Sequence, residues 1–167
     1  LIAFAGHAYI QTPLTSDYQA LRLFLDHLKV GSVPTPGTDI ATAIKTARES
    51  FQKLSKQSKK VLIIFSDGES FENDPVHSAK VAAKNGLFIY TIGIGTANGE
   101  PIPLLDASNQ FMGYKKDKNG QVILSQLNET VLKQISTESK GLFLRSNQGQ
   151  FVANTIYAHI SLMEKKL

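Results

Sequence analysis

Residues 61–65, VLIIF, form an unbroken apolar run that leads directly into the polar sequence SDGE at 66–69. Because apolar and polar positions do not alternate, both faces of the predicted strand need cover, which is typical of a central strand in a parallel sheet. In open α/β sheets, ligands bind beyond the carboxyl ends of such strands. We therefore expect Asp67 to lie at an edge of the sheet where a ligand can bind.

Strands alternate with amphipathic helices along the rest of the chain. We expect strands at 1–5, 8–15, 61–65, 87–95 and 142–146, and helices that begin near residues 17, 39, 75, 128 and 151. Residues 96–110 are expected to form a loop, and 111–124 a β-hairpin insertion that turns at Asn119-Gly120. This order predicts one α/β domain over 1–167, with a doubly wound, mostly parallel sheet and helices on both faces.

The composition excludes several classes of function. The chain has no cysteine, so it has no disulfide, thiolate nucleophile or sulfur-ligated metal. A net charge of +4 and scattered lysines argue against nucleic-acid binding. No apolar run approaches the roughly 20 residues of a membrane span. The chain has no signal peptide and begins inside a predicted strand without Met, so we expect it to be a segment of a longer protein.

Two loops carry residues suited to a metal site. The sequence PGTDI at 36–40 places Thr38 at the start of a helix, and FSDGES places Asp67 at the end of a strand. Both positions belong to the same rim of such a sheet, and hydroxyl and carboxylate oxygens are donors that Mg²⁺ or Mn²⁺ prefers. Each residue also has a purely structural explanation, since Thr38 can cap its helix and Asp-Gly is common in turns.

Other motifs carry less weight. The sequence GIGTANG does not match a phosphate-binding GxGxxG loop, and Pro101 and Pro103 prevent the helix that such a loop needs. The four histidines have no metal-ligand spacing. The acidic residues Glu69, Glu72 and Asp74 are more simply explained as a solvated helix entry than as part of a site.

Three segments, PGTDIATAI, VLIIFSDGE and GLFIYTIGIGTANGEPIP, together resemble a von Willebrand factor type A domain. The first 25 residues are similar to the bacterial Bat (aerotolerance-type) proteins of that family, and the resemblance extends over essentially the whole chain. It implies a metal-ion-dependent adhesion site with ligands from a DxSxS motif, a threonine and an aspartate. Thr38 and Asp67 match the last two. The residues expected to support these loops are Gly37, Asp39, Ser66, Gly68 and Glu69.

The DxSxS motif does not occur in this sequence. In the family it ends a central strand that precedes the segment matching residue 1, so the resemblance implies a sheet without that first central strand. Thr38 and Asp67 would then be two of five expected ligands, and we expect Mg²⁺ (or Mn²⁺ or Ca²⁺) to bind this chain weakly or not at all. The strands at 1–5 and 61–65 would either close on each other or, as we favour, drive self-association through exposed edges.

The resemblance implies a binding module and not an enzyme. A protein partner would supply an acidic residue to the metal, and other Bat-type membrane proteins are the expected partners. The parent protein would be anchored in the bacterial inner membrane with this domain on the periplasmic side. Two alternatives stay open: a Mg²⁺-dependent phosphatase-like hydrolase that uses Asp67, and a metal-independent structural scaffold that docks neighbours through the hairpin at 111–124.

Overall fold

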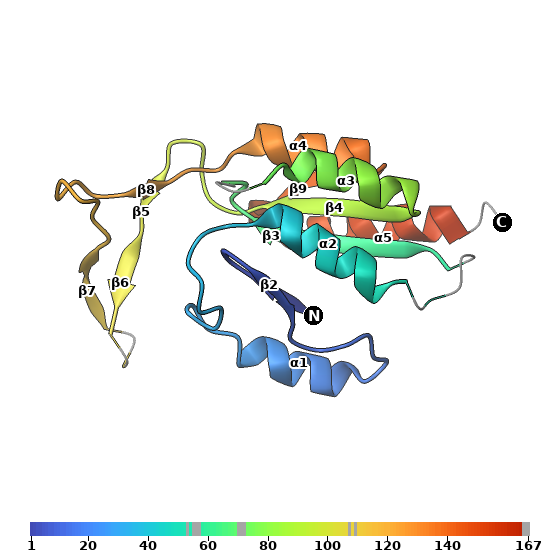
Figure 1. Ribbon diagram of the computed structural model, residues 1–167, viewed down its shortest axis with the longest axis horizontal. Coiled ribbons are helices and arrows are strands. Elements are labelled where there is room, and N and C mark those ends of the chain that lie inside the picture. Colours follow the sequence, from blue (N-terminus) through green and yellow to red (C-terminus); the bar gives the residue numbers. More distant parts are fainter. Residues whose placement is uncertain (53, 55–57, 70–72, 107, 109, 165–167) are drawn as a thin grey trace.

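The structure is a computed structural model. A three-stranded parallel sheet lies at its centre (Figure 1). The described residues are 1–52, 54, 58–69, 73–106, 108 and 110–164. The strand order is β3–β4–β9, made of β3 (Lys60–Ser66), β4 (Leu87–Gly93) and β9 (Phe143–Arg145). The first two strands pair over their whole length, from Lys60 opposite Leu87 to Ser66 opposite Gly93. The two unbroken apolar segments are parallel strands, as the sequence predicts, and they pair with each other. The prediction of a central strand at 61–65 is wrong for this sheet, because β3 lies at its edge and β4 lies in the middle.

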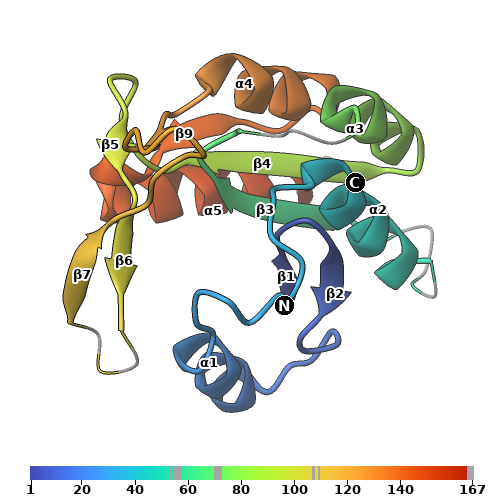
Figure 2. The same cartoon turned by 60° about the vertical axis from the view of Figure 1, so that its left-hand side comes forward.

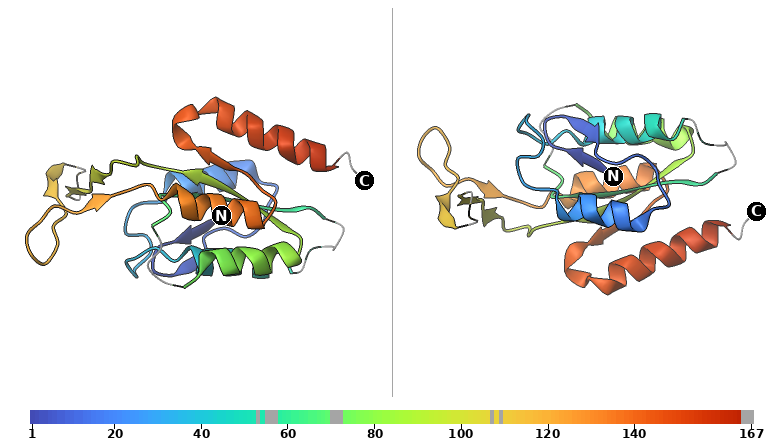
Figure 3. Two further views of the ribbon diagram at one scale, coloured as in Figure 1. Left: turned by 90° about the horizontal axis from the view of Figure 1, so that it is seen from above. Right: turned by 90° about the horizontal axis from the view of Figure 1, so that it is seen from below.

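Helices cover both faces of this sheet, as expected for a doubly wound fold. On one face lie α2 (Ile40–Ser50), α3 (Pro75–Lys84) and α4 (Glu129–Glu138), and on the other lies α5 (Gln150–Glu164), which follows β9 through the short 3₁₀ helix η1 (Ser146–Gln148) (Figure 3). Each face has its own buried cluster. The first includes Ile44, Ile64, Ile89, Leu132 and Ile135, and the second Tyr90, Ile92, Val152 and Ile156.

Local sequence signals set the ends of these helices. The side chains of Asp39, Asp74 and Asn128 cap α2, α3 and α4 by accepting hydrogen bonds from backbone N–H groups of the first turns. Pro75 occupies the first turn of α3, where a missing N–H costs nothing. Gly86 has φ 77°, which ends that helix as predicted.

The N-terminal strands form their own two-stranded sheet, which packs beside α2. The strands β1 (Ile2–Phe4) and β2 (Ala8–Ile10) pair antiparallel, and α1 (Tyr18–Asp26) follows, capped by Asp17. No residue of α1 is buried, and Figure 2 shows this helix set apart from the sheet. The expected apolar face of this helix is therefore present in the sequence but is not packed against the core.

The strands β1 and β3 do not close on each other. Within the described part of the chain, β1 pairs with β2 and β3 pairs with β4. The edge of β3 that faces away from β4 therefore has no strand partner there. Of the two outcomes expected for these edges, direct closure is wrong.

An arm, here the described residues of 100–125, projects from the body of the domain (Figures 1 and 2). It contains two antiparallel pairs: β5 (Glu100–Pro101) with β8 (Leu124–Ser125), and β6 (Pro103–Leu105) with β7 (Phe111–Tyr114). The turn before Gln121 is present, since Gly120 N–H donates to the carbonyl of Asp117.

The arm is longer than the hairpin expected at 111–124. The predicted loop at 96–110 contains β5 and β6, and β7 pairs with β6. The predicted hairpin forms only next to its turn, where Lys116 bridges Val122 in antiparallel fashion. The strands β5 and β6 were not predicted because Pro101 and Pro103 argue against a strand in this segment. Proline is tolerated in short edge strands at positions where no ladder hydrogen bond has to be donated.

Within the described ranges, no helix combines the length and the apolar character that crossing a bilayer requires.

Candidate functional site

Asp67 follows β3 directly and is held by three hydrogen bonds. Its backbone carbonyl accepts from the N–H of Asn128 at 2.7 Å. One carboxylate oxygen, Oδ1, accepts from the N–H of Glu69 at 3.1 Å, and the other, Oδ2, accepts from the hydroxyl of Ser125 at 2.8 Å. The carboxylate is therefore oriented by its own loop and by the segment that returns from the arm.

The neighbours of Asp67 fix the shape of its loop. The hydroxyl of Ser66, which is buried, accepts from the N–H of Gly68 at 3.0 Å. Gly68 has φ 75°, and a Cβ there would lie 2.5 Å from the carbonyl oxygen of Asn128. A carboxylate oxygen of Glu69 accepts from the N–H of Gln126 at 3.1 Å. These three residues clamp the loop against the segment 125–128.

Asp39, the carboxylate of the 36–40 loop, is buried, with 3% of its surface exposed. Its Oδ1 accepts from the N–H of Thr42 at 2.9 Å, and its Oδ2 accepts from the Thr42 hydroxyl at 2.5 Å and the Asn73 amide at 2.8 Å. Burial alone would raise the pKa of Asp39, but the hydrogen bonds from Thr42 and Asn73 hold that pKa below its ordinary value. Asp39 is therefore an ionised structural anchor.

The 36–40 loop contacts the residue that leads into α3. Asn73, which directly precedes the α3 cap residue Asp74, donates a hydrogen bond from its amide to Asp39. The N–H of Asp39 also donates to the carbonyl of Ala5 at 2.6 Å. Thr38 is half-buried between Asp39 and Gly37, whose φ is 121°. That Thr38 and Asp67 act together at one rim stays a prediction.

The residues of this rim fit a divalent cation in type. Asp67 offers a carboxylate, and Thr38 and Ser125 offer hydroxyls, all oxygen donors that suit Mg²⁺. Their number is small: in the described ranges, no group of three or more His, Asp or Glu side chains could hold a metal ion. We infer a site that could contribute few ligands and one formal negative charge.

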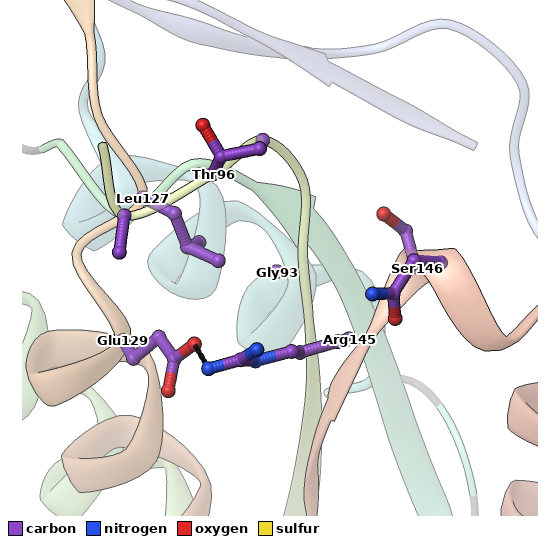
Figure 4. A pocket seen from close by; sticks show the side chains of 9 residues that line it. Gly93, Thr96, Leu127, Glu129, Arg145 and Ser146 are labelled. Carbon is purple, nitrogen blue, oxygen red and sulfur yellow. Dashed lines mark ion pairs between the residues drawn. The ribbon is translucent and has the colours of Figure 1, made fainter. Parts of the chain in front are cut away.

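A small cavity of about 120 Å³ lies at the carboxyl ends of β4 and β9, next to this rim (Figure 4). Glu129 and Arg145 face each other there as an ion pair, and Lys133 also bonds to Glu129 at 2.8 Å. The hydrogen bond from Lys133, with the charge of Arg145, holds the pKa of Glu129 below its ordinary value against the opposing effect of burial. Ligand pockets usually exceed about 300 Å³, so this cavity is too small for a nucleotide.

Sequence reasoning missed two residues of this region. Ser125 is 58 residues from Asp67 in the sequence, and no local pattern indicates that they meet. Arg145 could have been found, because it ends the predicted strand LFLRS and ends of parallel strands meet at one rim.

Comparison with known proteins agrees with this architecture. The family model of the von Willebrand factor type A domain matches residues 1–148. No curated protein matches the chain. The crystal structure of the conserved hypothetical protein BatB from Bacteroides thetaiotaomicron is similar, with 34% identity and a TM-score of 0.88. That match covers 98% of this chain and 78% of the BatB chain.

Two further structures extend the comparison. An aerotolerance-related membrane protein from Bacteroides fragilis, with multiple mutations to serines, has 33% identity and a TM-score of 0.82, covering 93% of this chain and 76% of that one. Proximal thread matrix protein 1 from the mussel byssus, with a zinc-occupied MIDAS motif, has 22% identity and a TM-score of 0.58, covering 87% of this chain and 29% of that one. The mussel protein supports the fold alone.

Proposed function

This chain belongs to the von Willebrand factor type A domain family, and we propose that it is an interaction module that binds a protein partner through a divalent cation at the rim of Thr38 and Asp67. One observation supports this most directly. The Asp67 carboxylate lies at the carboxyl end of β3 and is oriented by Ser125 and by the N–H of Glu69. Binding, and not catalysis, is the proposed role.

Asp67 and Thr38 would hold the ion, with Mg²⁺ as the first candidate and Mn²⁺ or Ca²⁺ as alternatives. The bound cation would attract an anionic ligand, because few negative ligands leave its charge under-neutralised. The chain's own residues position the ligands of the ion. Ser125 and the N–H of Glu69 orient the Asp67 carboxylate, and the Asp39–Asn73 hydrogen bond holds the 36–40 loop. The partner is proposed to supply a Glu or Asp side chain.

The proposed partner and location rest on the similarity to the relatives. One relative is named as a membrane protein and both Bacteroides relatives are at least 33% identical to this chain. We therefore extend the proposal to a domain anchored at the bacterial inner membrane on its periplasmic side, with other Bat-type membrane proteins as partners.

A pull-down with the full-length parent protein tests the metal dependence. Partner capture should occur with Mg²⁺ and be lost with chelator. Asp67→Asn and Thr38→Ala should reduce capture, whereas Asp26→Asn, which removes an exposed carboxylate at the end of α1, should not. Capture that is insensitive to both chelator and Asp67→Asn would contradict the proposal. Hydrolysis of a phosphoester panel that requires Mg²⁺ and Asp67 would instead favour the hydrolase alternative.

A second candidate function is metal-independent docking through the arm. Several large apolar side chains of the arm are exposed, among them Phe111 at 58% and Met112 at 71%. Contiguous exposed apolar groups often mark protein contact sites. If Phe111→Ser with Met112→Ser abolishes capture while chelator has no effect, the scaffold reading is correct.

A further inference from the structure

A second hollow, the basic hollow, lies at the opposite end of the sheet from the metal rim. It has a volume of about 460 Å³ and is bounded by the last turns of α2 and α3 and by the first residues of β3 and β4. This end is on the right in Figure 1, and α5 runs toward it. Its size lies within the roughly 300–1,000 Å³ of ordinary ligand pockets.

Three cations line the basic hollow: Arg48 from α2, Lys84 from α3 and Lys60 from β3. No Asp or Glu is among its described lining residues. None of the ion pairs between described residues involves these cations. The Nε atom of Arg48 is buried and has no hydrogen-bond partner. The cluster is therefore an uncompensated positive charge, with one buried donor unused.

The helix ends do not account for this charge. Cations near a helix C-terminus can satisfy its last carbonyls. Here backbone and amide groups already do so: the N–H of Phe51 bonds to the last carbonyls of α2, and Asn85 bonds to those of α3. Two helix ends carry about −0.5 charge each, so three cations leave a net charge of about +2.

Apolar groups stand beside the cations. Phe51 is half-buried and Leu54 is exposed at the wall of the hollow, and the buried Leu87 of β4 also lines it. A bare inorganic ion would leave these groups in contact with water. The lining therefore matches a doubly charged oxyanion that is joined to an organic portion.

We propose that the basic hollow binds a phosphate group carried by an organic molecule. Arg48 donates to the phosphate through its planar guanidinium, and Lys60 and Lys84 add point charges. The organic portion lies against Phe51 and Leu54. Both a soluble phosphomonoester and the phosphomonoester headgroup of phosphatidic acid carry this chemistry, and the experiment separates them.

The test uses two probes on the 167-residue chain. Calorimetry with glycerol 3-phosphate measures soluble binding, and co-sedimentation compares phosphatidic acid with phosphatidylcholine vesicles. At least one probe should bind saturably, and Arg48→Gln and Lys84→Gln should each weaken that binding by about tenfold or more. Lys45→Gln is the matched control, because Lys45 is exposed on α2 and lies outside the hollow.

Each outcome decides the proposal. Binding of only the soluble ester or only the anionic vesicles supports it and identifies the source of the phosphate. Absence of saturable binding by both probes overturns it, as does equal weakening by Lys45→Gln, which would indicate unspecific charge attraction. Circular dichroism shows whether each variant is folded. If Arg48→Gln does not fold, Lys84→Gln decides the proposal, because Lys84 is exposed.

Discussion

The hydroxyl of Ser125 donates a 2.8 Å hydrogen bond to the carboxylate of Asp67, although 58 residues separate the two in the sequence. Ser125 ends β8 at the base of the arm, and Asp67 follows β3, an edge strand of the parallel sheet. The position of the arm and the orientation of the proposed metal ligand are therefore linked by one contact. A partner that moves the arm would also disturb Asp67.

Removal of this contact should weaken the fold modestly. We expect Ser125→Ala to lower the free energy of unfolding by about 1 kcal/mol, because a half-buried carboxylate oxygen loses its hydroxyl donor. Ser125→Thr keeps the hydroxyl, so its free energy of unfolding should stay close to that of the unsubstituted chain. Urea denaturation measures both. Equal stability of Ser125→Ala and the parent would show that the hydrogen bond does not persist in solution.

The fold was largely predictable because its signals are local. The unbroken apolar runs at 61–65 and 87–92 predicted parallel strands, and Asn128 predicted a helix start. Thr38 was considered as the cap of α2, but Asp39 is the capping residue. The exposure of α1 was not predictable in this way. An amphipathic pattern indicates that a helix has an apolar face, but it does not say which element covers that face.

The candidate site was predictable only in part. Ends of parallel strands meet at one rim, so Asp67 could be found from its position after β3. Asp39 was expected to support its loop, but its hydrogen bond to Asn73 depends on a segment whose path the sequence does not encode locally. Ser125 depends in the same way on the return of the arm, which contains two strands where a loop was expected.

Gly68 should be intolerant of a side chain. Gly68→Ala is expected to cost about 1–2 kcal/mol for the left-handed backbone and about 1–3 kcal/mol more for overlap with the carbonyl of Asn128. Gly120 is a matched control, since it has φ 80° but open space where a Cβ would lie. Gly120→Ala should therefore show only the first cost. Thermal melts of both variants measure the difference, and equal destabilisation would refute the close approach.

Asp39 should make stability depend on acid pH. Its pKa in the folded chain lies below the ordinary value of 3.8, so the folded state favours the ionised form. The stabilisation is thus fully present above about pH 4 and is lost as pH falls through the lower folded pKa. Asp39→Asn should be less stable than the parent at pH 7, and the difference should shrink below about pH 3. A constant difference across this range would contradict the assignment.

Mg²⁺ should bind this chain weakly. Thr38 and Asp67 offer two ligands with one formal negative charge, so water would complete most of the coordination, and we expect a Kd of about 1 mM or weaker. Asp67→Asn should remove the remaining binding, and Asp26→Asn should leave it unchanged. Calorimetry measures all three chains. Micromolar affinity in the parent chain, or binding that survives Asp67→Asn, would show that the ligands lie elsewhere.

The free edge of β3 should drive self-association. The carbonyl of Ser66 accepts from the N–H of Ile94 beyond β4, and backbone groups alternate sides along a strand. The N–H and C=O groups of Val61, Ile63 and Phe65 therefore point to the unpaired edge. The side chains of the last two are 41% and 58% exposed. An exposed apolar edge of this kind recruits further strands.

Light scattering should accordingly give an apparent mass that rises with protein concentration. Ile63→Lys should shift the chain toward the monomer, because a charge on an edge strand opposes pairing with another strand. Leu23→Lys is the control, since Leu23 is also an exposed apolar residue but lies on α1, away from the edge. If the parent chain stays monomeric over the whole concentration range, or if Leu23→Lys dissociates it as well as Ile63→Lys does, the edge of β3 is not the contact.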